Sequence, residues 1–299
     1  MHPISYHPSG NNTTDILFSI IIPSWNNLAL AQLCVDSIKK NSRYKHQVIL
    51  HLNEGNDGTK DWAVEQELDH THSAENVGVC YGMNAAYSLA KAEYIVFMND
   101  DMYACPDWDF YLKEQIDKFK DHLFYVSGTL IEPKESGNVC VCAPYNFGSS
   151  AADFKEKELL EKYTSINKED WNGASWPPSL LHRKTWDLIG GFSVEFTPGM
   201  YSDPDICMKL WHAGVRQFVG VGKSKVYHFM SKSTGKLKKK VKVSGKQTFL
   251  NKWGITSRIL QKHYLRMGTR YKGALTQPDL TATYKSDMLR NKIKKIFTI

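Results

Sequence analysis

The sequence predicts an α/β protein in which a mostly parallel central sheet is flanked by helices and followed by a basic C-terminal extension. Two observations lead to this prediction: short apolar runs alternate with segments of helical periodicity, and positive charge is concentrated at the end of the chain. Strands that alternate with helices favour a sheet that helices cover on both faces. Ligands of such sheets bind outside the carboxyl ends of the strands.

The first third of the chain alternates regularly. Residues 18–22 and 47–52 are short apolar runs typical of buried strands, and between them apolar residues at positions 30, 33, 34 and 38 share one helical face. The polar turn at residues 53–59 leads into a further helix. Another helix is expected between residues 79 and 90, before residues 94–98, the most apolar strand candidate of the chain.

The order becomes less regular after residue 105. We expect a helix near residues 107–120, a strand near 123–131, a helix at about 153–162 and an aromatic, Pro-rich turn at 171–178. No internal repeat is visible, and the lysine-rich segment 232–246 is the only compositionally biased stretch.

The composition is that of a globular protein. The chain has 299 residues, of which 42% are hydrophobic and 23% charged, enough for one large domain or two small ones. Its 6 cysteines form no Cys-x-x-Cys pair and lie mostly in apolar stretches, as reduced cytoplasmic thiols do. The longest apolar run near the start is far shorter than the roughly 20 residues that span a bilayer, so we expect a cytoplasmic protein without a signal peptide.

Charge is distributed unevenly along the chain. The net charge is +7, but residues 223–299 contain 20 Lys and Arg against 2 Asp and Glu, a net charge of +18, which leaves −11 for residues 1–222. Such asymmetry predicts attraction to phosphates of a membrane surface, a nucleic acid or a phosphorylated ligand. Nucleic acid is the less favoured partner because the tail shows no recognised nucleic-acid-binding module.

Polar residues follow three of the predicted strands, and one group carries two carboxylates. Asn99, Asp100 and Asp101 come directly after the strand at residues 94–98. Mg²⁺ and Mn²⁺ bind a few protein oxygens together with substrate phosphates, so two acids at a rigid sheet edge suit either ion. The alternative is a solvated turn, because Asn and Asp favour turns after strands. The triplet alone leaves both interpretations open.

Taken together, several motifs resemble the family-two nucleotide-sugar glycosyltransferases in their order and rough spacing. The motifs are the turn at residues 53–59 and the segments SIIIPSWNN (19–27), ENVGVCYGMNAA (75–86), YIVFMNDDM (94–102), LLHRKTWDLIGGF (180–192) and YSDPDICMKLWHAGV (201–215). The resemblance covers about residues 16–230. It implies a Rossmann-like glycosyltransferase A fold, an Asp-x-Asp metal motif and inversion at the anomeric carbon.

With this resemblance, the chain divides into three parts. We expect a flexible N-terminus at residues 1–15, a catalytic domain at 16–230, and a basic loop with a helical extension at 231–299. Within the domain, a nucleotide half at about 16–104 precedes an acceptor half at about 105–230.

The resemblance also implies roles for individual residues of the nucleotide half. Asp101 becomes the metal ligand at the end of the Asp-x-Asp triplet, and Asn99 stands where the family more often has its first Asp. Asn99 and Asp100 then lie against the donor ribose and sugar, and Asn53 or Glu54 reads the base. The full set expected to contact the donor is Pro23, Ser24, Asn26, Asn53, Glu54, Asn84, Asn99, Asp100 and Lys232.

Asp203 is the candidate general base, and Ser202 stands where the family usually has a Glu. An inverting transfer needs one carboxylate that removes the proton of the attacking hydroxyl. The alternative is a structural role, because Asp203, Pro204 and Asp205 before an apolar segment predict a helix start with Asp203 as N-cap and Pro204 at the first helical position. Capping would lower the pKa of Asp203.

His228 ends an apolar stretch and precedes a basic loop. The resemblance makes it a third metal ligand, and neutral imidazole does bind Mn²⁺ beside carboxylates. A lone histidine at a strand end is otherwise a hydrogen-bonded structural residue. We expect Asp101 and His228 to meet at one cation, with Lys232 and its neighbours folding over the diphosphate.

Two further features bear on the acceptor. Trp171 and Trp176 are weak candidates for stacking against an acceptor sugar, although tryptophan is more commonly a core residue. At the C-terminus, Leu289, Ile293, Ile296 and Phe297 share one helical face among basic residues. This helix is expected either to lie on an anionic membrane, on the inner face of which a lipid-linked acceptor is found, or to pack on the domain itself.

The sequence therefore predicts a metal-dependent inverting glycosyltransferase that uses Mn²⁺ or Mg²⁺ and a nucleotide-diphospho-sugar, UDP-linked in the favoured case, to glycosylate a glycan or lipid-linked acceptor of the bacterial envelope. A sugar-phosphate nucleotidyltransferase is one alternative, but it should show a Gly-rich phosphate loop after the first strand, and PSWNN at 23–27 is not one. A non-catalytic glycan- or phosphate-binding protein is the other, favoured by Asn99 and Ser202.

Overall fold

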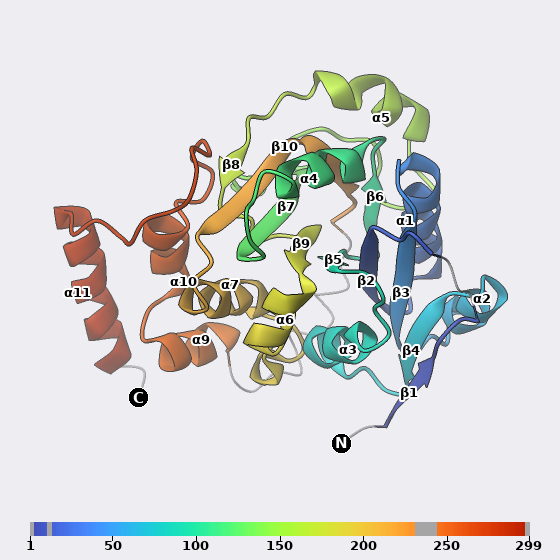
Figure 1. The fold of residues 1–299 in the computed structure, drawn as a ribbon, viewed down its shortest axis with the longest axis horizontal. Helices are drawn as coiled ribbons and strands as arrows, with labels where there is room; N and C mark the ends of the chain where they lie inside the picture. Colours follow the sequence, from blue (N-terminus) through green and yellow to red (C-terminus); the bar gives the residue numbers. More distant parts are fainter. Residues whose placement is uncertain (1–2, 11–13, 231–243, 297–299) are drawn as a thin grey trace.

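The computed structural model describes residues 3–10, 14–230 and 244–296 (Figure 1). Their strands form one ten-stranded sheet in the order β1-β4-β3-β2-β5-β9-β7-β10-β6, and β8 pairs with β10. The strands are β1 (Ile4–His7), β2 (Phe18–Trp25), β3 (His46–Asn53), β4 (Asp69–Ser73), β5 (Tyr94–Phe97), β6 (Met102–Ala104), β7 (Phe124–Ile131), β8 (Trp171–Asn172), β9 (Ser179–His182) and β10 (Gln217–His228).

The sheet is mixed, with a parallel centre. Strands β4, β3, β2 and β5 are parallel to one another, and so are β7 and β10. Strand β9 runs antiparallel between β5 and β7, and β1, β6 and β8 are antiparallel additions. Because β9 is antiparallel to both β5 and β7, strands β2, β3, β4, β5, β7 and β10 all run in one direction, as the predicted mostly parallel sheet requires, and β1, β6, β8 and β9 run against them. For β6 one reason is the short connection from β5, because residues 98–101 are too few for the crossover that parallel strands need.

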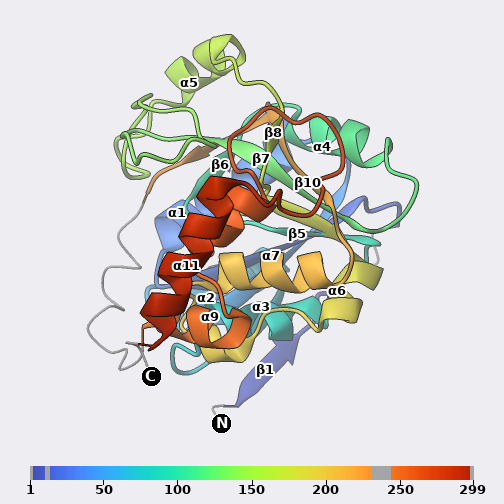
Figure 2. The ribbon, with the colours of Figure 1, turned by 90° about the vertical axis from the view of Figure 1, so that its left-hand side faces the viewer.

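Helices cover both faces of the sheet (Figures 1 and 2). One apolar core joins the sheet to α3, α6, α7 and α9, a second joins it to α1, α2 and α4, and a third joins α1 and α5 to β6 and the end of β10. The helices are α1 (Leu28–Asn41), α2 (Thr59–Glu65), α3 (Gly78–Tyr87), α4 (Trp108–Ile116), α5 (Glu156–Lys162), α6 (Arg183–Ile189), α7 (Ser202–His212), α9 (Gly245–Trp253), α10 (Ser257–Ile259) and α11 (Ala282–Ile296), with short helices η1 (Tyr163–Ser165), η2 (Val194–Phe196) and η3 (Leu260–Tyr264).

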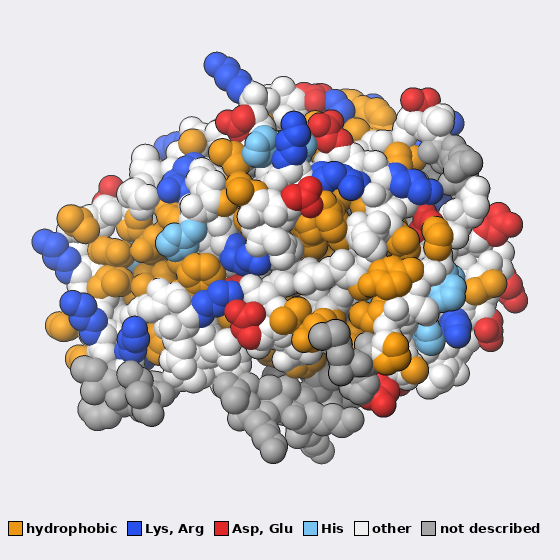
Figure 3. All heavy atoms as spheres, turned by 60° about the horizontal axis from the view of Figure 1, so that its bottom comes forward, with side chains coloured by type: hydrophobic (Ala, Val, Ile, Leu, Met, Phe, Trp, Pro, Cys, Tyr) orange, Lys and Arg blue, Asp and Glu red, His pale blue; other side chains and the backbone are white. Residues whose placement is uncertain are grey.

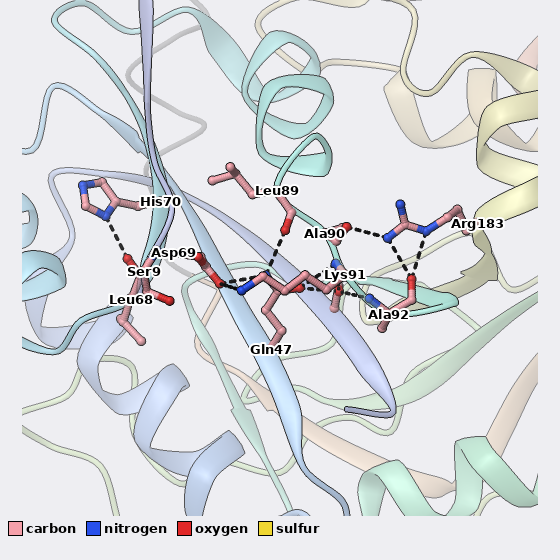
Figure 4. A network of polar contacts seen from close by, with 11 residues as sticks. Ser9, Gln47, Leu68, Asp69, His70, Leu89, Ala90, Lys91, Ala92 and Arg183 are labelled. Carbon is pink, nitrogen blue, oxygen red and sulfur yellow. Dashed lines mark hydrogen bonds and ion pairs between the residues drawn. The ribbon is translucent and has the colours of Figure 1, made fainter. Parts of the chain in front are cut away.

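The sequence predicted a flexible N-terminus at residues 1–15, but part of this segment is ordered. Strand β1 pairs with β4 from Ile4 to His7. A buried polar network anchors the residues that follow (Figure 4). Asp69 accepts hydrogen bonds from the backbone N–H of Ser9 and from the side chain of Gln47, each at 2.7 Å. Gln47 in turn bonds the backbone of Leu89 and Lys91, before β5. The network joins three distant parts of the chain, so local sequence could not reveal it.

The C-terminal extension packs on the domain. Phe249 of α9, Leu260 of η3 and Leu265 belong to the same apolar core as Trp211 of α7. Asn291 of α11 is buried, and its side chain accepts a hydrogen bond from the Thr256 N–H at 2.9 Å and donates one to the Gly254 carbonyl at 2.7 Å. Figure 2 shows α11 lying across this region.

Candidate functional site

The carboxyl ends of β2, β3 and β5 meet, as the parallel centre of the sheet requires. The Ser24 hydroxyl at the end of β2 donates a 2.7 Å hydrogen bond to Asp100, just after β5. The Asn26 side chain donates to the Glu54 carboxylate at 2.8 Å and accepts from the Asn56 N–H at 2.9 Å. Both Asn26 and Glu54 have positive φ, of 46° and 62°, so the backbone turns sharply where these polar groups gather.

Two predicted donor contacts bond to the protein itself. The side-chain oxygen of Asn53 is buried and accepts a 2.9 Å hydrogen bond from the Val77 N–H, just before α3. The amide of Asn84 donates to the Phe192 carbonyl at 2.8 Å and accepts from the Phe192 N–H at 2.9 Å. Asn84 thus joins α3 to the segment after α6, and these two bonds use one of its two N–H groups and one of the two lone pairs of its oxygen.

Asp101 and His228 lie side by side, 127 positions apart in the sequence. Their Oδ2 and Nε2 atoms are 3.5 Å apart, and the Phe229 N–H donates to the Asp101 carbonyl at 3.0 Å. The pairing of β10 with β6, in which His228 stands opposite Met102, brings them together. On the other side of the ring, Nδ1 of His228 lies 3.0 Å from the Glu132 carboxylate.

The electrostatics of this edge are dominated by buried carboxylates. Burial raises the pKa of Asp100, the neighbouring charge of Asp101 raises it further, and the Ser24 hydrogen bond opposes both. Burial would lower the pKa of His228, but its contacts with Asp101 and Glu132 overcome this and raise it to about 9. The site therefore concentrates negative charge that a cation would neutralise.

The residues present fit a divalent cation that is completed by a ligand. Glu132 occupies Nδ1 of His228 and leaves Nε2 directed toward Asp101, the arrangement in which a carboxylate orients a metal-binding imidazole. Within residues 3–10, 14–230 and 244–296, no group of three or more His, Cys, Asp or Glu side chains could hold a metal ion. Mg²⁺ and Mn²⁺ do not need such a group when substrate phosphates supply the other ligands.

Asp203 lies in the first turn of α7 but does not cap it. The helix begins at Ser202, its N-cap is Tyr201 with φ of 73°, and no side chain caps it. The predicted capping role is therefore wrong: the Tyr201 backbone turns so that Asp203 falls inside the helix. Asp203 makes no hydrogen bond to another described residue, and its surroundings raise its pKa to about 7 by desolvation, where capping would have lowered it.

The start of α7 is close to the nucleotide half. The Val79 N–H of α3 donates a 2.9 Å hydrogen bond to the Pro198 carbonyl, and a side chain at Gly78 would collide with the Pro198 backbone. Burial raises the pKa of Cys80 in α3 and of Tyr125 in β7, and the charge of Asp203 adds to the rise of both, so this carboxylate is within electrostatic reach of the two side chains. Because Asn53 also bonds Val77, a continuous chain of contacts links the end of β3 to the helix that carries Asp203.

The other predicted residues are distributed as follows. Pro23 and Asn99 are partly exposed at the strand ends, whereas Lys232 lies outside the described residues. Trp171 is a core residue and not part of an acceptor cleft: it is 2% exposed, it packs against Gly220, and its indole N–H donates to Thr129 at 3.0 Å. Trp176 is partly exposed and stays a candidate.

Glu132 is a functional candidate that the sequence analysis missed. It directly follows β7 and is buried, and its second oxygen accepts a 3.0 Å hydrogen bond from Ser136. One signal was available, because an acidic residue directly after an apolar strand is the pattern that singled out Asp100 and Asp101. Its relation to His228 depends on the pairing of β7 with β10, which the sequence does not reveal.

Comparison with known proteins identifies the fold and gives a family match over part of the chain. Residues 19–156 match the model of Glycosyl transferase family 2, and no curated protein matches the chain. The 1–349 fragment of S. aureus TarS has a TM-score of 0.55 at 13% identity, over 95% of this chain and 72% of that one. The complex of the same fragment with UDP-GlcNAc has a TM-score of 0.54 at 14% identity, over 95% of this chain and 73% of that one.

A second solved structure, GalNAc-T7 with UDP, GalNAc and Mn²⁺, has a TM-score of 0.53 at 14% identity, over 73% of this chain and 44% of that one. The chain therefore spans less than half of GalNAc-T7. At these identities the likeness concerns the fold, which is the glycosyltransferase A fold that the sequence predicted. Residues 19–156, just under half of the chain, match the family model, and this match together with the shared fold supports the family-two nucleotide-sugar glycosyltransferase that the motifs implied.

Proposed function

We propose that this chain transfers a sugar, with inversion at the anomeric carbon, from a UDP-linked donor to a hydroxyl of a glycan or lipid-linked acceptor. The observation that carries the proposal is the meeting of Asp101 and His228 at 3.5 Å beside the polar ends of β2 and β5. The choice of UDP is supported by the neighbours, since TarS was solved with UDP and UDP-GlcNAc and GalNAc-T7 with UDP, GalNAc and Mn²⁺.

Binding of the donor is assigned to the strand ends. Asp101 and His228 would hold a divalent cation, Mn²⁺ or Mg²⁺, which when bound would offset charge on the diphosphate. Glu132 keeps Nε2 of His228 directed at this position. Around it, the residues proposed to contact the nucleoside, ribose and sugar are Pro23, Ser24, Asn26, Glu54, Asn99 and Asp100, with Asn53 shaping the pocket by holding the start of α3.

Asp203 is proposed as the general base. Its carboxylate removes the proton of the acceptor hydroxyl as that oxygen attacks the anomeric carbon. The bond from this carbon to the diphosphate oxygen breaks, and its electron pair leaves with UDP. Attack from the side opposite the leaving group gives inversion. A pKa of about 7 suits this role, because the group is a stronger base than an ordinary carboxylate and is still ionised near neutral pH.

The Asp203→Asn variant tests the base. We expect turnover to fall by about 10²–10⁴-fold, while UDP affinity measured by calorimetry stays the same. Asp36→Asn, which removes an exposed carboxylate on α1, is the control and should retain full turnover. Unchanged turnover in Asp203→Asn would remove this residue from the mechanism.

The Asp101→Ala variant tests the metal bridge. Calorimetry of UDP with and without Mn²⁺ should show tighter binding with the ion in the unaltered protein. In the variant the Mn²⁺-dependent gain should fall by at least about tenfold, because one of two protein ligands is lost. Equal UDP affinity with and without Mn²⁺ in the unaltered protein would contradict a metal bridge.

A panel of UDP-sugars discriminates the other candidate functions. A transferase without acceptor should release UDP slowly by hydrolysis of its donor, and a sugar-phosphate nucleotidyltransferase should instead form a nucleotide-sugar from a nucleoside triphosphate and a sugar phosphate. A binding protein should bind UDP or glycan without either reaction. Formation of a nucleotide-sugar would overturn the proposal.

A further inference from the structure

The face of α11 that carries Leu289 and Ile293 is not the face that packs on the domain. The side chains directed at the domain are Tyr284, Met288 and Asn291, of which Asn291 is 3% exposed. Leu289 and Ile293 are one turn apart and are 62% and 48% exposed. The structure thus answers the question that the sequence left open: the helix packs on the domain and still presents apolar side chains to its surroundings.

Positive charge surrounds these two side chains. The helix carries Lys285, Arg290, Lys292, Lys294 and Lys295, and its only acidic residue is Asp287. Asp287 is already paired, with Lys262 at 2.7 Å and His263 at 2.9 Å. Figure 3 shows Lys and Arg side chains among hydrophobic ones at the left-hand end, which α11 occupies in Figure 1.

We propose that α11 docks on the surface of an anionic lipid bilayer, with Leu289 and Ile293 inserted at the headgroup level and the basic side chains against lipid phosphates. Exposed apolar residues flanked by Lys and Arg are the pattern of helices that lie in the plane of a membrane. Among the described residues no helix is long and apolar enough to cross a bilayer, so contact through this helix is peripheral. The inference does not depend on the proposed transfer reaction.

The buried Asn291 makes this face a fixed feature of the fold. Its two hydrogen bonds to the segment before α10 set the rotation of α11, since any rotation that buried Leu289 would withdraw Asn291 from both partners. The helix is therefore held with its apolar residues outward. Charge complementarity selects lipid phosphate as the partner, because this surface would repel a cationic one.

Vesicle sedimentation tests the proposal with the full chain. Vesicles of phosphatidylcholine with about one third phosphatidylglycerol should bind the protein, and vesicles of phosphatidylcholine alone should bind much less. Added salt should weaken the binding, because it screens the lysines and arginine. No binding to the anionic vesicles would overturn the proposal.

Two double variants separate the apolar and the electrostatic contributions. Leu289→Ser with Ile293→Ser, and Arg290→Gln with Lys292→Gln, should each weaken anionic-vesicle binding by about tenfold or more. The matched controls are Val64→Ser, an apolar residue of α2 that is 57% exposed, and Lys120→Gln with Lys157→Gln, two exposed lysines elsewhere. Both controls should bind as the unaltered protein does. All the changed side chains are exposed, so circular dichroism and thermal unfolding should not change.

Other partners give different results. If the face is covered by a second copy of the chain, analytical ultracentrifugation should show association that the Leu289→Ser and Ile293→Ser variant loses, which would overturn the proposal. If the helix only attracts polyanions, the Arg290→Gln and Lys292→Gln variant should lose binding to both vesicles and transfer RNA while the serine variant keeps both. That outcome would also overturn it.

Discussion

Asp203 has properties that a structural carboxylate at a helix start does not have. It makes no hydrogen bond to a described side chain or backbone group, it leaves the helix uncapped, and burial raises its pKa to about 7. A desolvated carboxylate kept without a partner lowers stability, so its presence at the start of α7, beside α3, points to chemistry.

The pH dependence of the reaction follows from this pKa. Asp203 accepts a proton only when it is ionised, so kcat/KM should rise as pH increases through about 7 and level off above it. The residual activity of Asp203→Asn should lack this rise. A profile that is flat between pH 5 and pH 9 in the unaltered protein would contradict a base with this pKa.

Asp203→Asn should also change the stability of the protein. Loss of a helix cap would lower the free energy of unfolding, whereas removal of a desolvated charge should raise it. The folded pKa of about 7 lies above the ordinary value of 3.8, so the folded protein holds this proton more tightly. Stability from this group is therefore lost as pH rises from about 4 to about 7. At pH 8 we expect the variant to be more stable by about 1–2 kcal/mol, allowing for the partial exposure of the side chain, and at pH 4 to match the unaltered protein. Urea denaturation at both pH values measures this, and destabilisation at pH 8 would indicate a structural role.

Glu132 is expected to act through His228. Glu132→Gln removes the carboxylate that orients the ring, and the Mn²⁺-dependent gain in UDP affinity should fall by about 10–100-fold, with metal-free UDP affinity unchanged. Ser136→Ala, which removes only the hydrogen bond to the second Glu132 oxygen, is the control and should have a small effect. Calorimetry of both variants decides this. If the two variants behave alike, the 3.0 Å contact between Glu132 and His228 has no role in metal binding.

At the scale of elements, α9 holds α7, the helix that carries Asp203, in position through polar contacts. Lys252 forms ion pairs with Asp205 of α7 at 2.9 Å and with Glu195 of η2 at 2.7 Å, and the Trp253 indole donates to Asp205 at 2.8 Å. Asp205 is 1% exposed, so its carboxylate depends on these partners. The position of Asp203 thus depends on a helix that follows it by about forty residues in the chain.

Lys252→Met tests whether these contacts hold α7 in position. The loss of a charged partner to a buried carboxylate should destabilise the protein by about 2–3 kcal/mol, measured by urea denaturation. Turnover should fall because α7 is less well held, while UDP affinity should not change. The control is Lys246→Met, which removes an exposed lysine of the same helix. Equal stability and turnover in the two variants would show that α9 does not position α7.

The elements that the sequence predicted well are those whose signal is local. The runs at residues 18–22, 47–52 and 123–131 lie within β2, β3 and, to one residue, β7, because each is buried on both faces and reads as continuously apolar. The four-residue strands β1 and β9 carry no such signal, and their existence depends on partners far away in the sequence. The N-cap predicted for Asp203 was wrong because α7 is entered through Tyr201 at a φ of 73°, a backbone conformation that the sequence does not indicate.

The same distinction applies to the site at the scale of the whole molecule. The ends of β2 and β5 could be predicted, so Ser24, Asp100 and Asp101 were correctly placed at the carboxyl edge of the sheet. Residues whose role depends on contacts between distant segments could not be predicted: Glu132, which meets His228, was missed, and the bonds of Asn84 to Phe192 were not foreseen. His228 was proposed as a metal ligand from the family resemblance, because periodicity gives no sign of such a role. His228 lies beside Asp101 only because β10 pairs with β6.

The continuity of the sheet leads to a prediction about folding. The boundary expected near residue 104 separates β5 from its partner β9, in which Leu181 stands opposite Ile95. One apolar core contains Ile21 and Met83 from the first half together with Trp186 from the second. A fragment of residues 1–104 would expose the edge of β5 and the apolar face of α3, so it should lack cooperative unfolding in urea. In the full chain, circular dichroism and tryptophan fluorescence should report one coincident transition, because neither half can bury its core alone. Cooperative unfolding of the fragment would mean that the nucleotide half is an independent unit and that contacts such as those between Asn84 and Phe192 join two domains and not two parts of one core.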